Sequence, residues 1–124
     1  MNVVDSCGWL EYLADGPNAD FFAQAVENVG ELVVPTISIY EVFKRVLQQR
    51  DEDAALQAAA VMQQGMVVVL DPTMALNAAK LSTDFRLPLA DSVILATAWA
   101  YNATLWTQDA DFKGVDSVQY VEKR

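Results

Sequence analysis

Short apolar runs rich in valine and leucine alternate with segments of helical periodicity along nearly the whole chain. The runs are continuous rather than alternating, which is typical of strands that are buried on both faces of a sheet. The strands predicted from these runs are Val3-Val4 and residues 32–35, 66–70, 104–107 and 118–121. We expect 66–70 to be the clearest strand and 118–121 to lie at an edge of the sheet.

Between the strands, apolar residues recur every three or four positions, as they do on the buried side of a helix. The predicted helices cover 6–14, 17–29, 38–49, 51–64, 72–85 and 89–102. Gly30 and Gly65 fit the position just after a helix, where the backbone often becomes left-handed. The side chains expected to be buried on the third helix are Tyr40, Val42, Phe43, Val46 and Leu47. The last helix is apolar on almost every side, so we expect it to be the most buried.

The alternation of strands and helices predicts the α/β class. Because the strands are apolar throughout, we expect a three-layer α/β/α sandwich with a central, mainly parallel sheet. The chain has 124 residues, of which 53% are hydrophobic, and this suits one domain over 1–124 with a packed core. The longest predicted loop is 109–117, and no linker, repeat or low-complexity segment divides the chain.

The composition excludes several kinds of chemistry. The chain has no histidine, so it holds neither a Ser-His-Asp nor a Cys-His catalytic site. Its one cysteine, Cys7, cannot form an internal disulfide, and we expect a small buried thiol there. Acidic residues outnumber basic ones by 17 to 8, for a net charge of −9, which argues against a broad basic face for nucleic acid. Carboxylates are the reactive groups that the chain offers in quantity.

Two features bear on where the protein works. The segment 1–5 has no basic residue and already contains an acid, unlike a secretory signal peptide. The most apolar stretch, 93–101, is far shorter than the roughly 20 residues that span a bilayer. We therefore expect a soluble, cytoplasmic protein.

Four acids follow predicted strands or begin the helices after them. Asp5 directly follows the first strand, and Asp109 follows the fourth after one intervening residue. Glu41 lies in the first turn of the third helix, and Asp91 lies near the start of the last one. Because the carboxyl ends of parallel strands share one edge of a sheet, the four side chains can meet there. Adjacent carboxylates repel one another, whereas Mg²⁺ or Mn²⁺ binds such a set of oxygens.

Each of these acids also has a local role that needs no metal. Asp5 suits a helix N-cap, and Asp91 suits either an N-cap or an interaction with the helix dipole. Asp109 suits a turn. Ser38 and Glu41 have the spacing of a capping box, in which each side chain binds the other residue's backbone N–H.

Asp71 shows how little the local pattern decides. It follows a strand as Asp5 does, and it precedes Pro72, so an N-cap explains it fully. The acids that form a site therefore cannot be selected from local pattern alone.

Four segments form a more specific pattern through their order and spacing. They are Val3-Val4-Asp5-Ser6, Ser38-Ile39-Tyr40-Glu41-Val42, the segment Leu-Pro-Leu-Ala-Asp-Ser-Val-Ile-Leu-Ala-Thr-Ala at 87–98, and Leu-Trp-Thr-Gln-Asp-Ala-Asp-Phe at 105–112. Together they resemble a PIN-domain ribonuclease, specifically a VapC-type toxin of a type II toxin–antitoxin system. The match covers nearly the whole chain.

This resemblance implies a Mg²⁺- or Mn²⁺-dependent endoribonuclease that acts as the toxin of a toxin–antitoxin pair. The residues it implies are Asp5 and Asp91 as direct metal ligands, Glu41 and Asp109 as outer-shell ligands or ligands of a second ion, and Ser6 and Asp111 as accessory residues. Asp71 lies outside the family pattern, so we expect it to be a structural cap only.

The resemblance also implies partners: an RNA substrate, with transfer RNA as the family-level expectation, an antitoxin whose basic segment blocks the acidic site, and a homodimer. The basic residues that are either phosphate contacts or ordinary solvated charges are Lys44, Arg45, Arg50, Lys80, Arg86 and Lys113. The large apolar residues that either line a groove for an antitoxin helix or pack in the core are Trp9, Tyr12, Leu13, Phe21, Phe22, Tyr40 and Phe43.

Two other functions stay open. The chain is alternatively a catalytically silent binding module with a PIN fold, or a Mg²⁺-dependent phosphoryl-transfer domain with Asp5 as nucleophile. Dehalogenase-like phosphoryl-transfer enzymes require a second Asp two residues after the first, and this position is Cys7 here.

Overall fold

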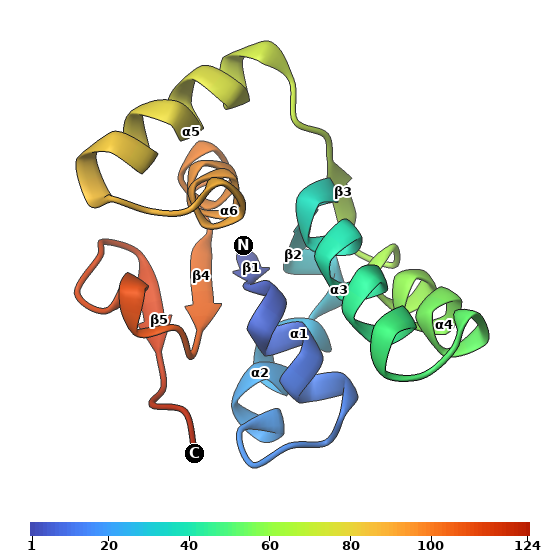
Figure 1. The fold of residues 1–124 in the computed structure, drawn as a ribbon. Coiled ribbons are helices and arrows are strands. Elements are labelled where there is room, and N and C mark those ends of the chain that lie inside the picture. Colours follow the sequence, from blue (N-terminus) through green and yellow to red (C-terminus); the bar gives the residue numbers. More distant parts are fainter.

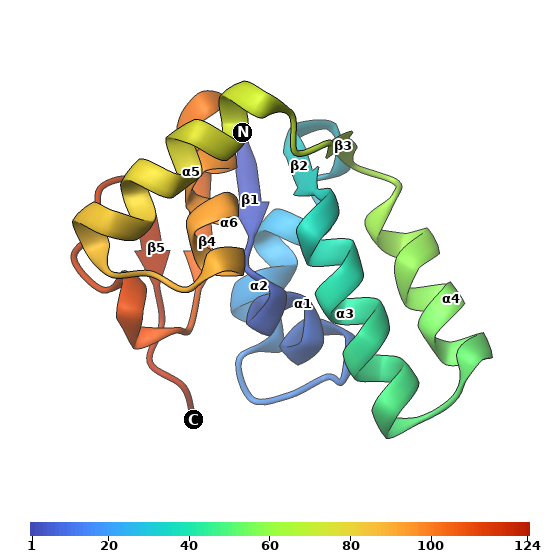
Figure 2. The same ribbon diagram turned by 45° about the horizontal axis from the view of Figure 1, so that its top comes forward.

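The computed structural model, which describes residues 1–124, has a five-stranded parallel sheet between two layers of helices (Figures 1 and 2). The strands are β1 (Asn2–Val4), β2 (Leu32–Pro35), β3 (Met66–Val68), β4 (Thr104–Thr107) and β5 (Val118–Tyr120). Their order across the sheet is β3-β2-β1-β4-β5, and all four neighbouring pairs are parallel. The predicted α/β/α sandwich is therefore confirmed.

Six α-helices connect and cover the strands. They are α1 (Ser6–Leu13), α2 (Ala19–Val26), α3 (Thr36–Gln49), α4 (Glu52–Met62), α5 (Pro72–Phe85) and α6 (Leu89–Ala100). Two short 3-10 helices, η1 (Val29–Glu31) and η2 (Ala110–Phe112), precede β2 and follow β4. Helices α1 to α4 pack on one side of the sheet and α6 on the other, where α5 covers α6. No helix has the length and hydrophobicity that crossing a membrane requires.

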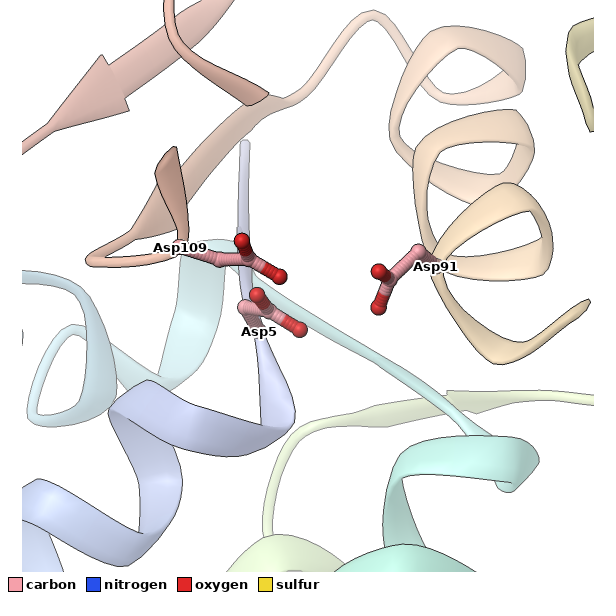
Figure 3. Close-up of side chains that lie close together, drawn as sticks. All are labelled: Asp5, Asp91 and Asp109. Carbon is pink, nitrogen blue, oxygen red and sulfur yellow. The ribbon is translucent and has the colours of Figure 1, made fainter. Parts of the chain in front are cut away.

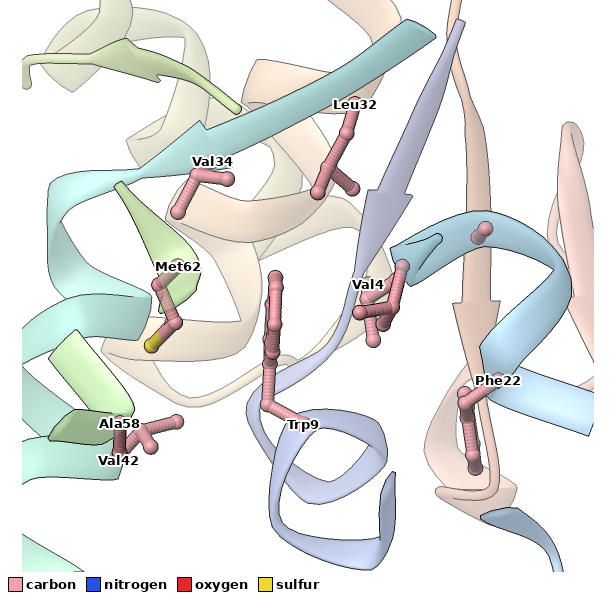
Figure 4. Packing of buried hydrophobic residues seen from close by; sticks show 10 residues of the cluster. Val4, Trp9, Phe22, Leu32, Val34, Val42, Ala58 and Met62 are labelled. Atoms are coloured by element: carbon pink, nitrogen blue, oxygen red, sulfur yellow. The ribbon is translucent and has the colours of Figure 1, made fainter. Parts of the chain in front are cut away.

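The two layers follow from the alternation of side chains along each strand. Val4 and Val34 point towards Trp9 in a cluster that also holds residues of α2, α3 and α4 (Figure 4). Their strand neighbours Val3 and Val33 point the other way, into a second cluster with α6. Each fully buried side chain of this kind contributes about 1.5–3 kcal/mol to folding, so both faces of the central strands hold the sheet in place.

Helix α6 is the most buried helix, as predicted. Seven consecutive residues from Ser92 to Ala98 are buried, because the helix lies between the sheet and α5. Its first turn lies near the carboxyl ends of the central strands, so a side chain there faces the edge where β1 and β4 end (Figures 1 and 3).

Several local predictions are wrong, each for a physical reason. Helix α2 ends at Val26 with Glu27 as C-cap, so Gly30 is not a cap but part of η1. The run at 66–70 is a strand only to Val68, because β3 is an edge strand and the chain leaves the sheet there. Val69 and Leu70 are exposed as a result.

Helix α3 begins two residues earlier than predicted, at Thr36. The buried side of α3 is also narrower than the apolar pattern indicates. Val42 is fully buried, whereas Tyr40 is 60% and Leu47 is 44% exposed. Other helices and strands lie within about two residues of their predicted limits, apart from the shorter ends of α2 and β3.

Candidate metal centre

Asp5 lies at the point where β1 ends and α1 begins. It is the N-cap of α1, as its position predicts, and its side chain is only 3% exposed. Oδ1 accepts a 2.8 Å hydrogen bond from the backbone N–H of Ser6, and Oδ2 accepts one of 2.8 Å from Oγ1 of Thr107. The Sγ of Cys7 also donates to Oδ2, at 3.3 Å. These bonds hold the carboxylate in one orientation.

Asp91 belongs to the first turn of α6. The predicted N-cap role is wrong for this residue, because α6 begins at Leu89 and Pro88 is its N-cap. The positive end of the helix dipole favours a carboxylate in this turn. Since α6 crosses the sheet, Asp91 faces the ends of β1 and β4 from the side (Figure 3).

Asp109 follows β4 and makes the turn that its position predicts. Its Oδ1 accepts a 2.9 Å hydrogen bond from the backbone N–H of Asp111, which caps η2. Its own backbone N–H donates to Oγ1 of Thr107 at 2.9 Å. One hydroxyl therefore links the backbone of Asp109 to the carboxylate of Asp5.

The three carboxylates of Asp5, Asp91 and Asp109 come together at the carboxyl edge of the sheet. One oxygen from each lies within 4.8 Å of the other two (Figure 3). The three residues are distant in sequence, and the sheet order places β1 beside β4 and so brings two of them side by side. We call these three residues the acidic cluster.

Glu41 lies next to this cluster through Ser6. The Oγ of Ser6 donates a 2.6 Å hydrogen bond to Oε1 of Glu41. The predicted capping box of Ser38 and Glu41 is wrong, because α3 begins at Thr36 and both residues lie within it. Ser38 is instead fully buried, and its hydroxyl has no hydrogen-bond partner.

Residues 3–118 match the PIN domain family. The chain belongs to the PIN domain family. This match spans the fold and every acid described above, and it confirms the resemblance seen in the sequence at the level of the family. No protein with a curated description matches the sequence significantly.

Solved structures share the fold at low sequence identity. A toxin–antitoxin complex from Klebsiella pneumoniae is 22% identical with a TM-score of 0.78, and the match covers 96% of each chain. A VapC toxin of Mycobacterium tuberculosis that cleaves the sarcin–ricin loop is 13% identical with a TM-score of 0.77, over 94% of this chain and 95% of that one. A VapBC complex of Rickettsia felis, bound to promoter DNA, is 12% identical with a TM-score of 0.74, over 98% and 97%.

The acidic cluster of this PIN domain carries uncompensated negative charge. Burial, and then the charges of Asp5, Asp109, Glu41 and Asp111, raise the pKa of Asp91 to about 7. Burial is also the main cause that raises the pKa of Asp5, against the hydrogen bonds that lower it. The one ion pair of the chain joins the N-terminus to Glu31, so no Lys or Arg neutralises the cluster.

The donor set of this PIN domain fits a hard divalent cation. The cluster offers carboxylate oxygens from three chain segments, and a hydroxyl and a further carboxylate lie beside them. Mg²⁺ and Mn²⁺ prefer all-oxygen ligand sets, whereas most zinc and copper sites include histidine or thiolate. Cys7 is not a thiolate ligand here, because burial and the nearby Asp5 raise the pKa of its thiol to about 12.

Two other acids, Asp71 and Asp111, lie outside the acidic cluster. Asp71 caps α5 by accepting a 2.8 Å hydrogen bond from the backbone N–H of Met74, and it follows the edge strand β3, apart from the cluster. Asp111 is exposed in η2, and its charge helps to raise the pKa of Asp91.

Thr107 is the residue at this site that the sequence analysis missed. It is fully buried at the last position of β4 and binds both Asp5 and the backbone of Asp109. A hydroxyl at the end of an apolar strand, two residues before an acid, was the available signal.

The basic residues of this PIN domain are on its surface. All six candidates for phosphate contacts are exposed. Lys44 lies over the ring of Tyr40, with Nζ 5.7 Å from the ring centroid. Tyr40 and Lys44 lie within one helical turn of Glu41 on α3. Lys44 is the basic residue of α3 that is nearest to Glu41 in sequence.

Proposed function

We propose that this PIN domain is a VapC-type toxin that cleaves RNA with Mg²⁺, or with Mn²⁺ in its place. The observation that carries the proposal is the acidic cluster, in which three carboxylates lie within 4.8 Å of one another without a basic partner. Such a cluster is unfavourable unless a cation binds or a proton remains on it.

Asp5 and Asp91 are the proposed direct ligands. Asp5 is suited to this role because the N–H of Ser6 and Oγ1 of Thr107 already fix its two oxygens, so the carboxylate loses little conformational freedom when a cation binds. Asp91 is suited because it is half-buried in the first turn of a rigid, buried helix. A bound Mg²⁺ supplies a water of lowered pKa and offsets the charge on the scissile phosphate.

Glu41 and Asp109 are proposed to complete the outer shell or to hold a second ion. The hydroxyl of Ser6 holds the carboxylate of Glu41. The carboxylate of Asp109 accepts from the backbone N–H of Asp111, and the hydroxyl of Thr107 holds the backbone N–H of Asp109, so both acids are restrained. As hydrogen-bond acceptors, these carboxylates orient water for attack in line with the leaving oxygen. Hydrolysis of this kind leaves a 5′-phosphate and a 3′-hydroxyl and does not require the ribose 2′-hydroxyl. Asp111 is proposed as an accessory acid.

An antitoxin is the proposed protein partner. The structures similar in fold include toxin–antitoxin complexes, and an unneutralised acidic cluster is complementary to an inserted Arg or Lys. A groove of about 310 Å³ between α1, α3 and α4 supports a docking site for a helix, since it is lined mainly by apolar residues such as Leu10, Leu13 and Val61. Trp9 and Phe22 are core residues rather than part of this groove.

We further propose that the protein acts as a homodimer in the cytoplasm, on a structured RNA such as transfer RNA. The basic residues are few and exposed, which favours recognition of RNA shape over broad charge attraction.

Incubation of the purified chain with total RNA, with and without Mg²⁺, tests the proposal. Asp5→Asn and Asp91→Asn are expected to abolish metal-dependent cleavage while near-native melting temperatures show that the fold is kept. Asp71→Asn is the matched control, because it changes an acid with the same local pattern outside the cluster. It is expected to cleave RNA at the unsubstituted rate.

The ends of the products complete the test. Mapping is expected to find 5′-phosphates at a small number of positions. Cleavage that persists in both Asp5→Asn and Asp91→Asn would contradict the site assignment. An unsubstituted chain that neither cuts RNA nor changes its melting temperature with Mn²⁺ would point to a silent binding module, and an acyl phosphate on Asp5 would point to phosphoryl transfer.

A further inference from the structure

A cavity of about 490 Å³ opens directly beside the acidic cluster. Its lining residues are Cys7, Gln108, Asp109, Ala110, Tyr120, Glu122 and Lys123. The cavity shares Asp109 with the cluster, and Cys7 contacts Asp5. A group bound in the cavity would therefore adjoin a phosphate held at the cluster.

The buried side-chain amide of Asn18 fixes the wall of the cavity, including the C-terminal segment that follows β5. Nδ2 of Asn18 donates to Oε1 of Gln108 at 2.9 Å and to the backbone oxygen of Glu122 at 3.1 Å. The backbone N–H of Val121 donates to the oxygen of Thr107 at 3.0 Å. These bonds hold the segment after β5 against the end of β4 (Figure 1), so the cavity is formed before any ligand binds.

Gln108 brings an unpartnered donor to this cavity. Its side chain is only 7% exposed, and its Oε1 is taken by Asn18. The amide nitrogen Nε2 donates no hydrogen bond within the chain. The buried side-chain polar atoms without a hydrogen-bond partner are Trp9 Nε1 and Ser38 Oγ, so Nε2 of Gln108 reaches solvent, where the acceptor of a ligand can replace water.

Tyr120 brings an aromatic ring with a cation beside it. The ring lines the cavity, and Nζ of Lys113 lies 5.8 Å from its centroid. Aromatic rings next to Lys or Arg are the usual platforms on which bases of single-stranded nucleic acids stack.

The charges around the cavity select the kind of ligand. Asp109 and Glu122 are acids in its lining, so they disfavour a phosphate or carboxylate inside it. A neutral, flat group with both donors and acceptors fits this lining, because its donors can meet Asp109 and Glu122 while an acceptor meets Gln108. The cations Lys113 and Lys123 are exposed, where they can meet the phosphates on either side of such a group.

We infer that this cavity binds one unpaired base of the RNA substrate, next to the phosphate that is cut. Tyr120 stacks on the base, Gln108 donates to one of its acceptors, and Lys113 and Lys123 contact the flanking phosphates. The inference rests on the proposed function, and it adds that cleavage takes place where a base is free to leave its stack.

Binding is measured in the Asp91→Asn chain, which keeps the cavity and is not expected to cut RNA. The probes are fluorescently labelled ten-nucleotide RNAs of adenine, cytosine or uracil, followed by anisotropy. Tyr120→Ala in this background is expected to raise Kd about tenfold, as for loss of one stacked base, and Tyr120→Phe to leave it nearly unchanged. Tyr101→Ala is the matched control, because Tyr101 is exposed at the far end of α6 from Asp91.

Two further variants test the contacts to the base and to the flanking phosphates separately. Gln108→Glu is expected to change the ratio of the three affinities, because it keeps an acceptor for Asn18 and removes the donor to the base. Lys123→Gln changes an exposed residue that folding does not need, and it is expected to raise Kd about threefold with a shallower salt dependence. If Tyr120→Ala fails to fold, as judged by circular dichroism, the Lys123→Gln result decides.

Equal Kd values for Tyr120→Ala and Tyr101→Ala in folded chains overturn the inference. If the unsubstituted chain still cuts RNA in that case, the proposed function stands and only the cavity assignment fails. If the chain neither binds nor cuts RNA, both fail. A Tyr120→Ala chain that loses affinity for a basic antitoxin peptide but not for RNA also overturns the inference, since the cavity then takes the partner rather than the base.

Discussion

Ser6 holds Glu41 at the edge of the acidic cluster. Its hydroxyl donates a 2.6 Å hydrogen bond to Oε1 of Glu41, while its backbone N–H donates to Oδ1 of Asp5 at 2.8 Å. One residue thus fixes two carboxylates that lie 36 positions apart in the chain (5 and 41). Ser6 can do this because it is the first residue of α1, directly after the cap.

Removal of this hydroxyl is expected to loosen Glu41 without removing the metal site. Ser6→Ala should lower the free energy of unfolding by about 1 kcal/mol, the usual value for a partly buried hydrogen bond. Cleavage should slow several-fold and remain dependent on Mg²⁺. Thr83→Ala, which removes an exposed hydroxyl bonded to Ala79 in α5, is the control and should change neither quantity appreciably. A full loss of metal-dependent cleavage in Ser6→Ala would contradict a merely positioning role.

The stability of the metal-free protein should depend on pH through Asp91. Its pKa is raised from 3.8 to about 7 on folding, so between these pH values the folded state holds a proton that the unfolded state has released. Stability is therefore expected to fall as pH rises from about 4 to about 7. Thermal melts of the metal-free chain across this range check the sign.

Two comparisons isolate the cause of this pH dependence. Asp91→Asn should flatten the pH profile and melt at a higher temperature than the unsubstituted chain near neutral pH. Mg²⁺ should raise the melting temperature of the unsubstituted chain most above pH 7, where protons no longer compete for the carboxylates. If the melting temperature of the metal-free chain instead rises steadily from pH 4 to 7, the raised pKa of Asp91 is contradicted.

Asp71 is expected to matter for stability alone. Its side chain accepts the 2.8 Å hydrogen bond from the N–H of Met74 that caps α5. Asp71→Ala should lower the free energy of unfolding by about 1 kcal/mol, the usual cost of a lost N-cap. Urea denaturation measures this change, and RNA cleavage at a temperature where the variant is folded should be unaltered.

Gly8 is expected to tolerate no side chain. A Cβ there would lie 2.5 Å from Cε1 of Phe22 and 2.8 Å from Cγ1 of Val4, and both of these side chains are fully buried. Gly8→Ala should therefore destabilise the protein by about 1–3 kcal/mol, although alanine favours a helix.

Gly30→Ala is the matched control for this substitution. A Cβ at Gly30 would meet nothing within 4 Å. Its unfolding free energy should stay the same or rise by a few tenths of a kcal/mol. If both substitutions have equal effects in chemical denaturation, close packing of α1 on α2 is not what requires Gly8.

The strands and helices were largely predictable because their signals are local. The periodicity of apolar residues and the caps at Asp71 and Asp5 depend on neighbours a few positions away. The predictions failed where burial depended on distant segments. Tyr40 is apolar enough for a core, yet it is exposed, and the apolar run after Met66 forms an edge strand with one neighbour only.

By itself, the sequence determined the alternation of elements, the absence of histidine chemistry and the set of acids at strand ends. Only the tertiary structure decided which of these acids meet. Asp5 and Asp71 both follow a strand and cap a helix, but β1 is central and lies beside β4, whereas β3 is at the edge. The acidic cluster therefore depends on strand order, which arises from contacts between residues about a hundred positions apart, such as Thr107 and Asp5.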